Sequence, residues 1–140
     1  MHILIADDDK EDFEILQEAA VLAGQHLTIS YAANWMELWR TLLKKLPDVL
    51  FLDLNMPVKN GFECLETIRA ELKFNRLTIA VYSTSHIKAD IDNAYRLGAN
   101  YYIIKQNSLQ NTTNMLKHLM AIDKQQLIAV PAREEFVIVR

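Results

Sequence analysis

The sequence is poor in cysteine, glycine and long apolar runs. Cys64 is the single cysteine of 140 residues, which excludes an intrachain disulfide, and there are only three glycines, too few for the glycine-rich loops of nucleotide-binding proteins. No apolar run has the length of a membrane span, and the start MHILIADDD lacks the basic residues and long apolar stretch of a signal peptide. We therefore expect a cytoplasmic protein that does not enter a membrane.

Basic residues are too scattered to form a nucleic-acid interface. The sequence has 15 Lys and Arg against 18 Asp and Glu, a formal net charge of -3, without the basic patch that binds phosphate backbones. Its four histidines are dispersed and show no metal-binding spacing, which argues against a zinc site. Hydrophobic residues make up 51%, enough for a full core. These features predict a globular domain that binds no nucleic acid.

Five strand-like segments alternate with five amphipathic segments along the chain. The expected strands cover residues 3–6, 27–32, 49–52, 78–82 and 101–104. After each of them, apolar residues recur at three- and four-residue steps, which is typical of helices packed on one face. Gly24, Pro47 and Gly98 stand where the first, second and fourth helices should end. The alternation predicts an α/β fold, a doubly wound five-stranded parallel sheet with helices on both faces.

The last stretch of the chain, residues 125–140, stands outside this alternation. It contains Pro131 and a strand-like end, Phe136-Val137-Ile138-Val139, which is too apolar to lie free in water. We therefore expect a domain over 1–124 and a C-terminal extension over 125–140. The extension would either pack on its own domain or pair with another chain as an added strand. Of the two we favour self-association, which would make the protein a homodimer.

Polar side chains follow four of the five expected strands. The strands end in Asp7-Asp8-Asp9, Asp53, Ser83-Thr84 and Lys105. Ligands of open parallel sheets bind beyond the carboxyl ends of the strands, so these groups should meet at one edge. Taken singly, each has an ordinary structural explanation, and we assign Asp9 only the role of a helix cap. Their common placement at strand ends predicts one functional site.

The chemistry of this edge favours phosphoryl transfer. Several carboxylates in one pocket raise one another's pKa, and Mg²⁺ relieves the repulsion because it prefers oxygen ligands. Phosphoryl transfer depends mainly on positioning and charge neutralisation. Asp53 would be the nucleophile, with Lys105 and Ser83 as donors to the phosphoryl oxygens.

These residues resemble the response-regulator receiver domain, in particular the single-domain regulators of chemotaxis. The resemblance runs from Ile3 to Met120. Its motifs are the acidic pair Asp7-Asp8, the run Phe51-Leu52-Asp53-Leu54-Asn55-Met56-Pro57 followed by Asn60-Gly61, then Ser83 and Lys105 at the family's usual distances. The resemblance implies a flavodoxin-like receiver fold with the strand order 2-1-3-4-5.

The resemblance also implies a Mg²⁺-dependent phosphoacceptor in a two-component phosphorelay. Asp53 would accept a phosphoryl group from a phosphohistidine of a sensor histidine kinase or a histidine phosphotransfer protein. Asp8 would ligate Mg²⁺ directly, Asp7 mainly through water, and Asp53 and the carbonyl of Asn55 would complete the protein ligands. Apart from its own phosphorylation and dephosphorylation, such a protein catalyses no reaction.

The resemblance also implies a conformational switch, with Tyr102 at the family's aromatic switch position. Lys105 would pair with the phosphoryl group, Ser83 would move toward it, and Tyr102 would turn inward as Ser83 moves. The changed surface, formed by the fourth helix, the fifth strand and the fifth helix around Tyr102, would bind a downstream target protein.

Three positions depart from the family pattern. Gln106 follows Lys105 where proline is usual, Ser83 replaces the commoner threonine, and Thr84 stands where a small residue is preferred. A cis bond before a residue other than proline costs about 2.5–4 kcal/mol, so we expect a trans or strained bond and an altered loop before the last helix. Thr84 would crowd access to the phosphoryl group.

Three alternatives compete with a phosphoacceptor. An aspartyl phosphatase requires a second aspartate where Asn55 stands, and a flavin carrier would place its phosphate against the repelling acids after the first strand. A receiver fold that has lost phosphorylation and only binds a partner is supported by Thr84 and the missing proline.

Overall fold

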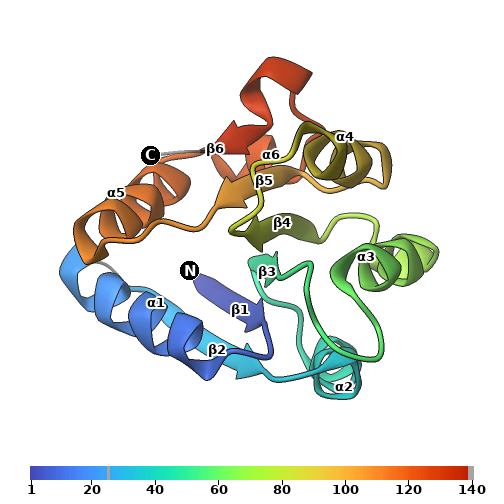
Figure 1. The fold of residues 1–140 in the computed structure, drawn as a ribbon, viewed down its shortest axis with the longest axis horizontal. Helices are drawn as coiled ribbons and strands as arrows, with labels where there is room; N and C mark the ends of the chain where they lie inside the picture. The colour runs from blue at the N-terminus through green and yellow to red at the C-terminus, as the bar shows by residue number, and fades with distance from the viewer. Residues whose placement is uncertain (25, 139–140) are drawn as a thin grey trace.

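The computed structural model of the protein describes residues 1–24 and 26–138 (Figure 1). Its strands are β1 (His2–Ala6), β2 (Thr28–Ala32), β3 (Val49–Leu52), β4 (Thr78–Ser83), β5 (Tyr101–Ile104) and β6 (Val137–Ile138). Its α-helices are α1 (Lys10–Ala23), α2 (Trp35–Lys44), α3 (Gly61–Arg69), α4 (Lys88–Arg96), α5 (Leu109–Met120) and α6 (Lys124–Leu127). Two short 3-10 helices, η1 (Leu72–Phe74) and η2 (Arg133–Glu135), complete the secondary structure of this part of the chain.

The sheet is parallel throughout, in the order β2-β1-β3-β4-β5-β6. The five predicted strands and their order, 2-1-3-4-5, are confirmed. The difference is the sixth strand: β6 adds to the outer edge of β5, with Val137 beside Tyr102 and Ile138 beside Ile103. Val139, which we expected to continue this strand, lies outside the described residues.

Helices cover both faces of the sheet, so the protein has two cores (Figure 1). Helices α2, α3 and α4 pack on one face, and α1 and α5 pack on the other. Successive residues of a strand point to opposite faces, so Leu4 and Ala6 of β1 enter one core while Ile3 and Ile5 enter the other. Burial on both faces explains why these strands are continuous apolar runs.

The ends of the helices follow local signals in the sequence. The side chain of Asp9 accepts a hydrogen bond from the Glu11 amide at the start of α1, the predicted cap. Gly24 ends the same helix with φ 72°, in the left-handed region that glycine adopts without a steric cost. Helix α2 stops at Lys44, and Leu46, which we expected within it, is 45% exposed. No helix of the described residues is long and apolar enough to cross a membrane.

Residues 128–138, which we call the C-terminal strap, lie against the rest of the chain. The Tyr95 hydroxyl of α4 donates to the carbonyl of Pro131 at 3.0 Å, and Arg133 forms a 2.7 Å ion pair with Asp92. Phe136 is fully buried, with its ring 4.9 Å from that of Tyr95 in an edge-on arrangement. The reason for expecting self-association, an apolar tail free in water, therefore does not hold for Phe136.

Val58 is the non-glycine residue with positive φ among the described residues, at 68°. This conformation costs an L-residue roughly 1–2 kcal/mol, more for a β-branched one, and the Val58 side chain is fully exposed, so no packing offsets the strain. We expect Val58→Gly to raise the free energy of unfolding by about 0.5–1 kcal/mol in urea titrations, after the entropy that glycine adds to the unfolded chain. Val21→Gly, at an exposed site inside α1, should instead lose roughly 0.5 kcal/mol. Destabilisation by both changes would contradict strain at Val58.

Candidate functional site

The ends of β1 and β3 bring three carboxylates together. The backbone amide of Asp7 donates to Ala32 of β2 at 3.1 Å, and that of Asp53 donates to Ala6 of β1 at 3.0 Å, so both residues continue the pattern of the sheet. One carboxylate oxygen from each of Asp7, Asp8 and Asp53 lies within 4.8 Å of the others. Such a group of oxygen donors can hold a metal ion.

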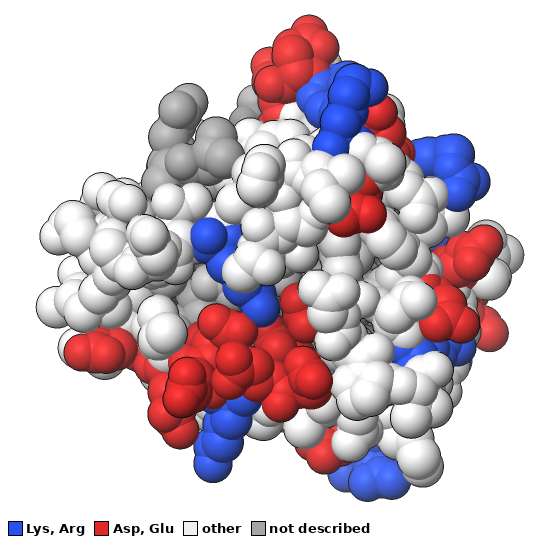
Figure 2. Space-filling view, viewed as in Figure 1, with Lys and Arg blue, Asp and Glu red and all other residues white. Residues whose placement is uncertain are grey.

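Lys105 extends from the end of β5 into this cluster. Its Nζ lies 2.8 Å from Asp7 Oδ2 and 3.4 Å from Asp53 Oδ1, and its side chain is only 10% exposed. The predicted residues Asp7, Asp8, Asp53 and Lys105 therefore meet at the expected edge of the sheet. Figure 2 shows the acidic side chains as one patch over the start of α1 and the adjoining strand ends, bordered by basic atoms.

Burial and repulsion from neighbouring carboxylates weaken the ionisation of Asp7 and Asp53. Burial raises the pKa of Asp7 to about 6, although hydrogen bonds from Lys105 and the Asp9 amide act in the opposite direction. Burial also raises the pKa of Asp53, against the effect of Lys105. Burial alone would lower the pKa of Lys105, but its hydrogen bonds to Asp12 and Asp7 outweigh this and raise it. Lys105 alone therefore does not offset the cost of burying the Asp7 and Asp53 carboxylates, and a bound cation would favour their ionised forms.

Asp12 is a member of this cluster that the sequence did not indicate. It lies in the first turn of α1, and its Oδ2 is 2.8 Å from Lys105 Nζ. An acid in the first turn of a helix is favoured by the helix dipole in any protein, so its position gave no sign of a further contact.

Gly61 supports the backbone of Asp53 from the start of α3. Its amide donates to the carbonyl of Leu54 at 3.0 Å. A Cβ atom at Gly61 would lie 2.3 Å from the Asp53 carbonyl oxygen and 2.7 Å from the Leu54 Cα, far below any normal contact. The glycine of the Asn60-Gly61 pair is therefore required by close approach to the residue that carries the predicted nucleophile.

Ser83 and Tyr102 lie beside the cluster, and both are fully buried. Ser83 Oγ accepts a hydrogen bond from the Ser85 amide at 3.1 Å, and the Lys105 amide donates to the Ser83 carbonyl at 2.8 Å. The Tyr102 hydroxyl donates to the carbonyl of Ser85 at 2.8 Å. Tyr102 thus already occupies the inward position that we expected it to reach only after Ser83 moves. The Phe136 ring packs near that of Tyr102, at 6.4 Å between centroids.

A cleft of about 450 Å³ lies next to the acids, and Asp8, Asn55 and Ser85 line it. Asn55 is therefore near Asp8, as a carbonyl ligand would have to be. Thr84 is exposed and does not line this cleft. The described peptide bonds are all trans, including the bond before Gln106, whose side chain donates to the Ile104 carbonyl at 2.8 Å.

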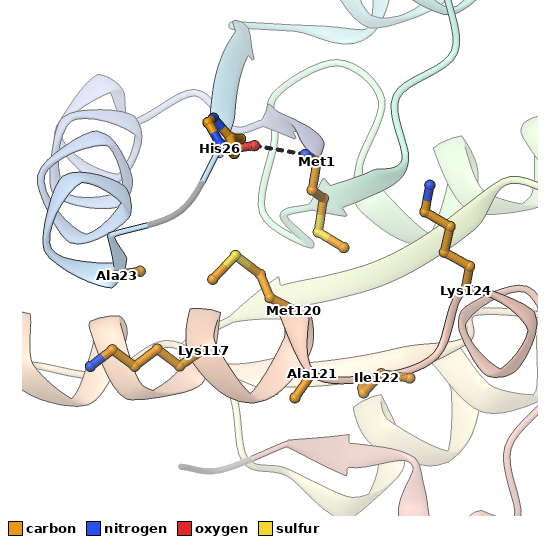
Figure 3. Close-up of a pocket in the computed structure, with 8 residues that line it drawn as sticks. All are labelled: Met1, Ala23, His26, Lys117, Met120, Ala121, Ile122 and Lys124. Carbon is orange, nitrogen blue, oxygen red and sulfur yellow. Dashed lines mark hydrogen bonds between the residues drawn. The ribbon is translucent and has the colours of Figure 1, made fainter.

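A second hollow, of about 590 Å³, is separate from the acidic cluster (Figure 3). Met1 and Met120 point into it, and the amino group of Met1 donates to the carbonyl of His26 at 2.7 Å. It lies between the ends of α1 and α5 and shares no residue with the cleft near Asp53.

The fold and the arrangement of acids and lysine are those of a signalling receiver. The family model of the response regulator receiver domain matches residues 3–117, and the chain belongs to this family, which acts in two-component signalling. The chemotaxis protein CheY homolog of Campylobacter jejuni is 35% identical over 107 residues, which cover 75% of this chain and 81% of that protein. Response regulator Rcp1 of Synechocystis is 26% identical over 122 residues, 82% of this chain and 83% of that protein.

Solved structures of response regulators share the fold. The phosphorylated cyanobacterial phytochrome response regulator RcpA has a TM-score of 0.75 and 31% identity, covering 84% of this chain and 89% of its own. The Mn²⁺-bound form of Rcp1 has a TM-score of 0.74 and 25% identity, covering 94% of this chain and 99% of its own.

Proposed function

We propose that the protein is a cytoplasmic response regulator that accepts a phosphoryl group on Asp53 in a Mg²⁺-dependent reaction. The donor is a phosphohistidine of a sensor histidine kinase or of a histidine phosphotransfer protein. The observation that carries the proposal is the contact of Lys105 with Asp7 and Asp53, at 2.8 and 3.4 Å, across three strand ends. Among the similar structures, RcpA is phosphorylated and Rcp1 has bound Mn²⁺, which supports a phosphoacceptor that uses a divalent cation.

Asp53 acts as the nucleophile in the transfer step. An oxygen of its ionised carboxylate forms a bond to phosphorus while the bond between phosphorus and the imidazole nitrogen of the partner breaks. The bonding electron pair leaves with that nitrogen. Lys105 stands 3.4 Å from the attacking carboxylate and donates to the phosphoryl oxygens, and Ser83 donates a further hydrogen bond from the end of β4.

Asp7, Asp8, Asp53 and the Asn55 carbonyl would hold Mg²⁺. The donor set fits, because the three carboxylates lie within 4.8 Å of one another and burial disfavours the ionisation of Asp7 and Asp53 without a cation. When bound, Mg²⁺ supplies the positive charge that keeps the carboxylates ionised and neutralises phosphoryl oxygens. Asp7 and Asp8 place their carboxylates at the end of β1, where the Asp9 amide donates a hydrogen bond of 2.9 Å that holds the Asp7 carboxylate in position.

The switch connects Ser83 to the face formed by α4, β5 and the strap. The Ser85 carbonyl accepts a hydrogen bond from the Tyr102 hydroxyl, and the Ser85 amide donates one to Ser83 Oγ. A movement of Ser83 therefore changes the position of Tyr102. Tyr102 in turn packs against Phe136 of the strap. A downstream target protein would therefore bind a surface that includes the strap.

Intact mass spectrometry after incubation with acetyl phosphate tests the proposal. We expect the wild type to gain one phosphoryl group with Mg²⁺ present, and Asp53→Asn to gain none because its amide is no nucleophile. Addition of EDTA should prevent the gain in the wild type. A folded wild type that gains nothing with Mg²⁺ present would remove Asp53 as acceptor and favour a receiver fold that only binds a partner. A gain in Asp53→Asn would place the phosphoryl group elsewhere.

A further inference from the structure

Asp12 brings a further carboxylate to Lys105, from the face of the sheet that α1 covers. Its contact of 2.8 Å equals that of Asp7 and is shorter than the 3.4 Å between Lys105 and Asp53. Lys105 hydrogen-bonds to both Asp7 and Asp12. The ammonium is thereby held nearer to α1 than to the predicted phosphoacceptor.

An ammonium group has three N–H donors, so each hydrogen bond to one acceptor leaves fewer donors for the others. Asp7 and Asp53 already have roles in the proposed site, as ligand and as acceptor. Asp12, 21% exposed at the rim of the cluster, has Lys105 as its partner. A phosphoryl group on Asp53 would have to draw Lys105 away from this carboxylate or share it.

We propose that Asp12 is a positioning residue that holds Lys105 away from Asp53 and so controls the occupancy of the phosphorylation site. This inference rests on the proposed function. In the unphosphorylated protein, Asp12 leaves Asp7 and Asp53 with less of the lysine charge and thereby favours their binding of Mg²⁺. In the phosphorylated protein, Asp12 competes with the phosphoryl oxygens for the same ammonium and weakens their hold.

The two effects of removing Asp12 have opposite signs. With Asp12→Asn, Lys105 loses a charged acceptor and moves onto Asp7 and Asp53, where it competes with the cation. We expect Mg²⁺ to bind about tenfold more weakly, the scale of one hydrogen bond to a charged group. At saturating Mg²⁺, beryllofluoride, a phosphoryl mimic, should bind about tenfold more tightly, because Lys105 is free to contact it. Structural damage to the site would instead weaken the binding of both Mg²⁺ and beryllofluoride.

The measurements are Mg²⁺ titration by calorimetry and beryllofluoride titration by ¹⁹F NMR. Glu11→Gln is the control, because it removes one negative charge from the same turn of α1 at a residue that forms no ion pair with Lys105. Asp12→Glu keeps a carboxylate within reach and should restore both affinities toward those of the wild type. Equal Mg²⁺ affinities in Asp12→Asn and Glu11→Gln, or a parallel loss of both ligands in Asp12→Asn, would overturn the role of Asp12.

Failure of the proposed function would look different. If beryllofluoride bound neither the wild type nor Asp12→Asn, the phosphoacceptor role of Asp53 would fail. The Mg²⁺ titration would still decide where Lys105 is held, because it needs no phosphoryl group.

Discussion

Replacing Gly61 with alanine should cost about 3 kcal/mol or more of unfolding free energy, the upper range for overpacking, and should nearly abolish phosphoryl uptake. The added Cβ would lie 2.3 Å from the Asp53 carbonyl oxygen and 2.9 Å from its carbon. Both are backbone atoms, so the clash cannot be relieved by a rotating side chain. The main chain of Asp53 must move, and a misplacement of about 1 Å at a reacting group can cost on the order of 100-fold in rate.

Urea unfolding and acetyl phosphate labelling of the same preparation measure the two effects of Gly61→Ala. Gly24→Ala is the control, since nothing lies within 4 Å of its added Cβ while φ is +72°. It should lose only about 1–2 kcal/mol, the cost of the left-handed conformation, and label as fast as the wild type. If Gly61→Ala lost no more stability than Gly24→Ala, the close approach between α3 and Asp53 would not exist in solution.

Replacing Phe136 with alanine should cost about 3–5 kcal/mol, the usual range for a buried phenylalanine. The side chain is fully buried between Tyr95 and Tyr102, and its carbonyl accepts the Tyr102 amide at 2.9 Å. The alanine variant would leave a cavity beside Tyr102, so its strand β6 should also lose amide protection in hydrogen exchange. Both changes are measurable without any phosphoryl donor.

Val130→Ala provides the matched control within the same segment. Val130 is 76% exposed, so its truncation should change stability by no more than about 0.5 kcal/mol. Gel filtration of the two variants and the wild type also tests self-association. Monomeric wild type together with a large loss in Phe136→Ala indicates a strap that packs on its own domain. Dimeric wild type with little loss in Phe136→Ala would restore the pairing of the extension with another chain.

The sequence predicted the parts of the fold that depend on local pattern. Strands buried on both faces must be apolar throughout, so Val49–Leu52 was recognisable without its neighbours. The meeting of Asp7, Asp53 and Lys105 followed from the topology alone, because parallel strands place their carboxyl ends at one edge.

What the sequence did not predict depends on contacts between distant segments. The two residues of β6 form a strand because they pair with the edge of β5, and no local sequence pattern indicates which strand they pair with. The inward position of Tyr102 depends on its hydrogen bond to the Ser85 carbonyl and on packing against Phe136. The contact of Asp12 with Lys105 likewise requires the crossing of α1 over the sheet, which periodicity does not describe.

The sixth strand also protects the sheet against aggregation. Without it, β5 would be an edge strand of sequence Tyr-Tyr-Ile-Ile, uncharged and rich in residues that favour β-structure, which is a template for pairing with other chains. The strand that covers it has two described residues and begins one residue after Arg133, Glu134 and Glu135. Charges beside a short edge discourage the addition of further strands. A chain whose strap has detached should therefore precipitate faster than its loss of stability alone would explain.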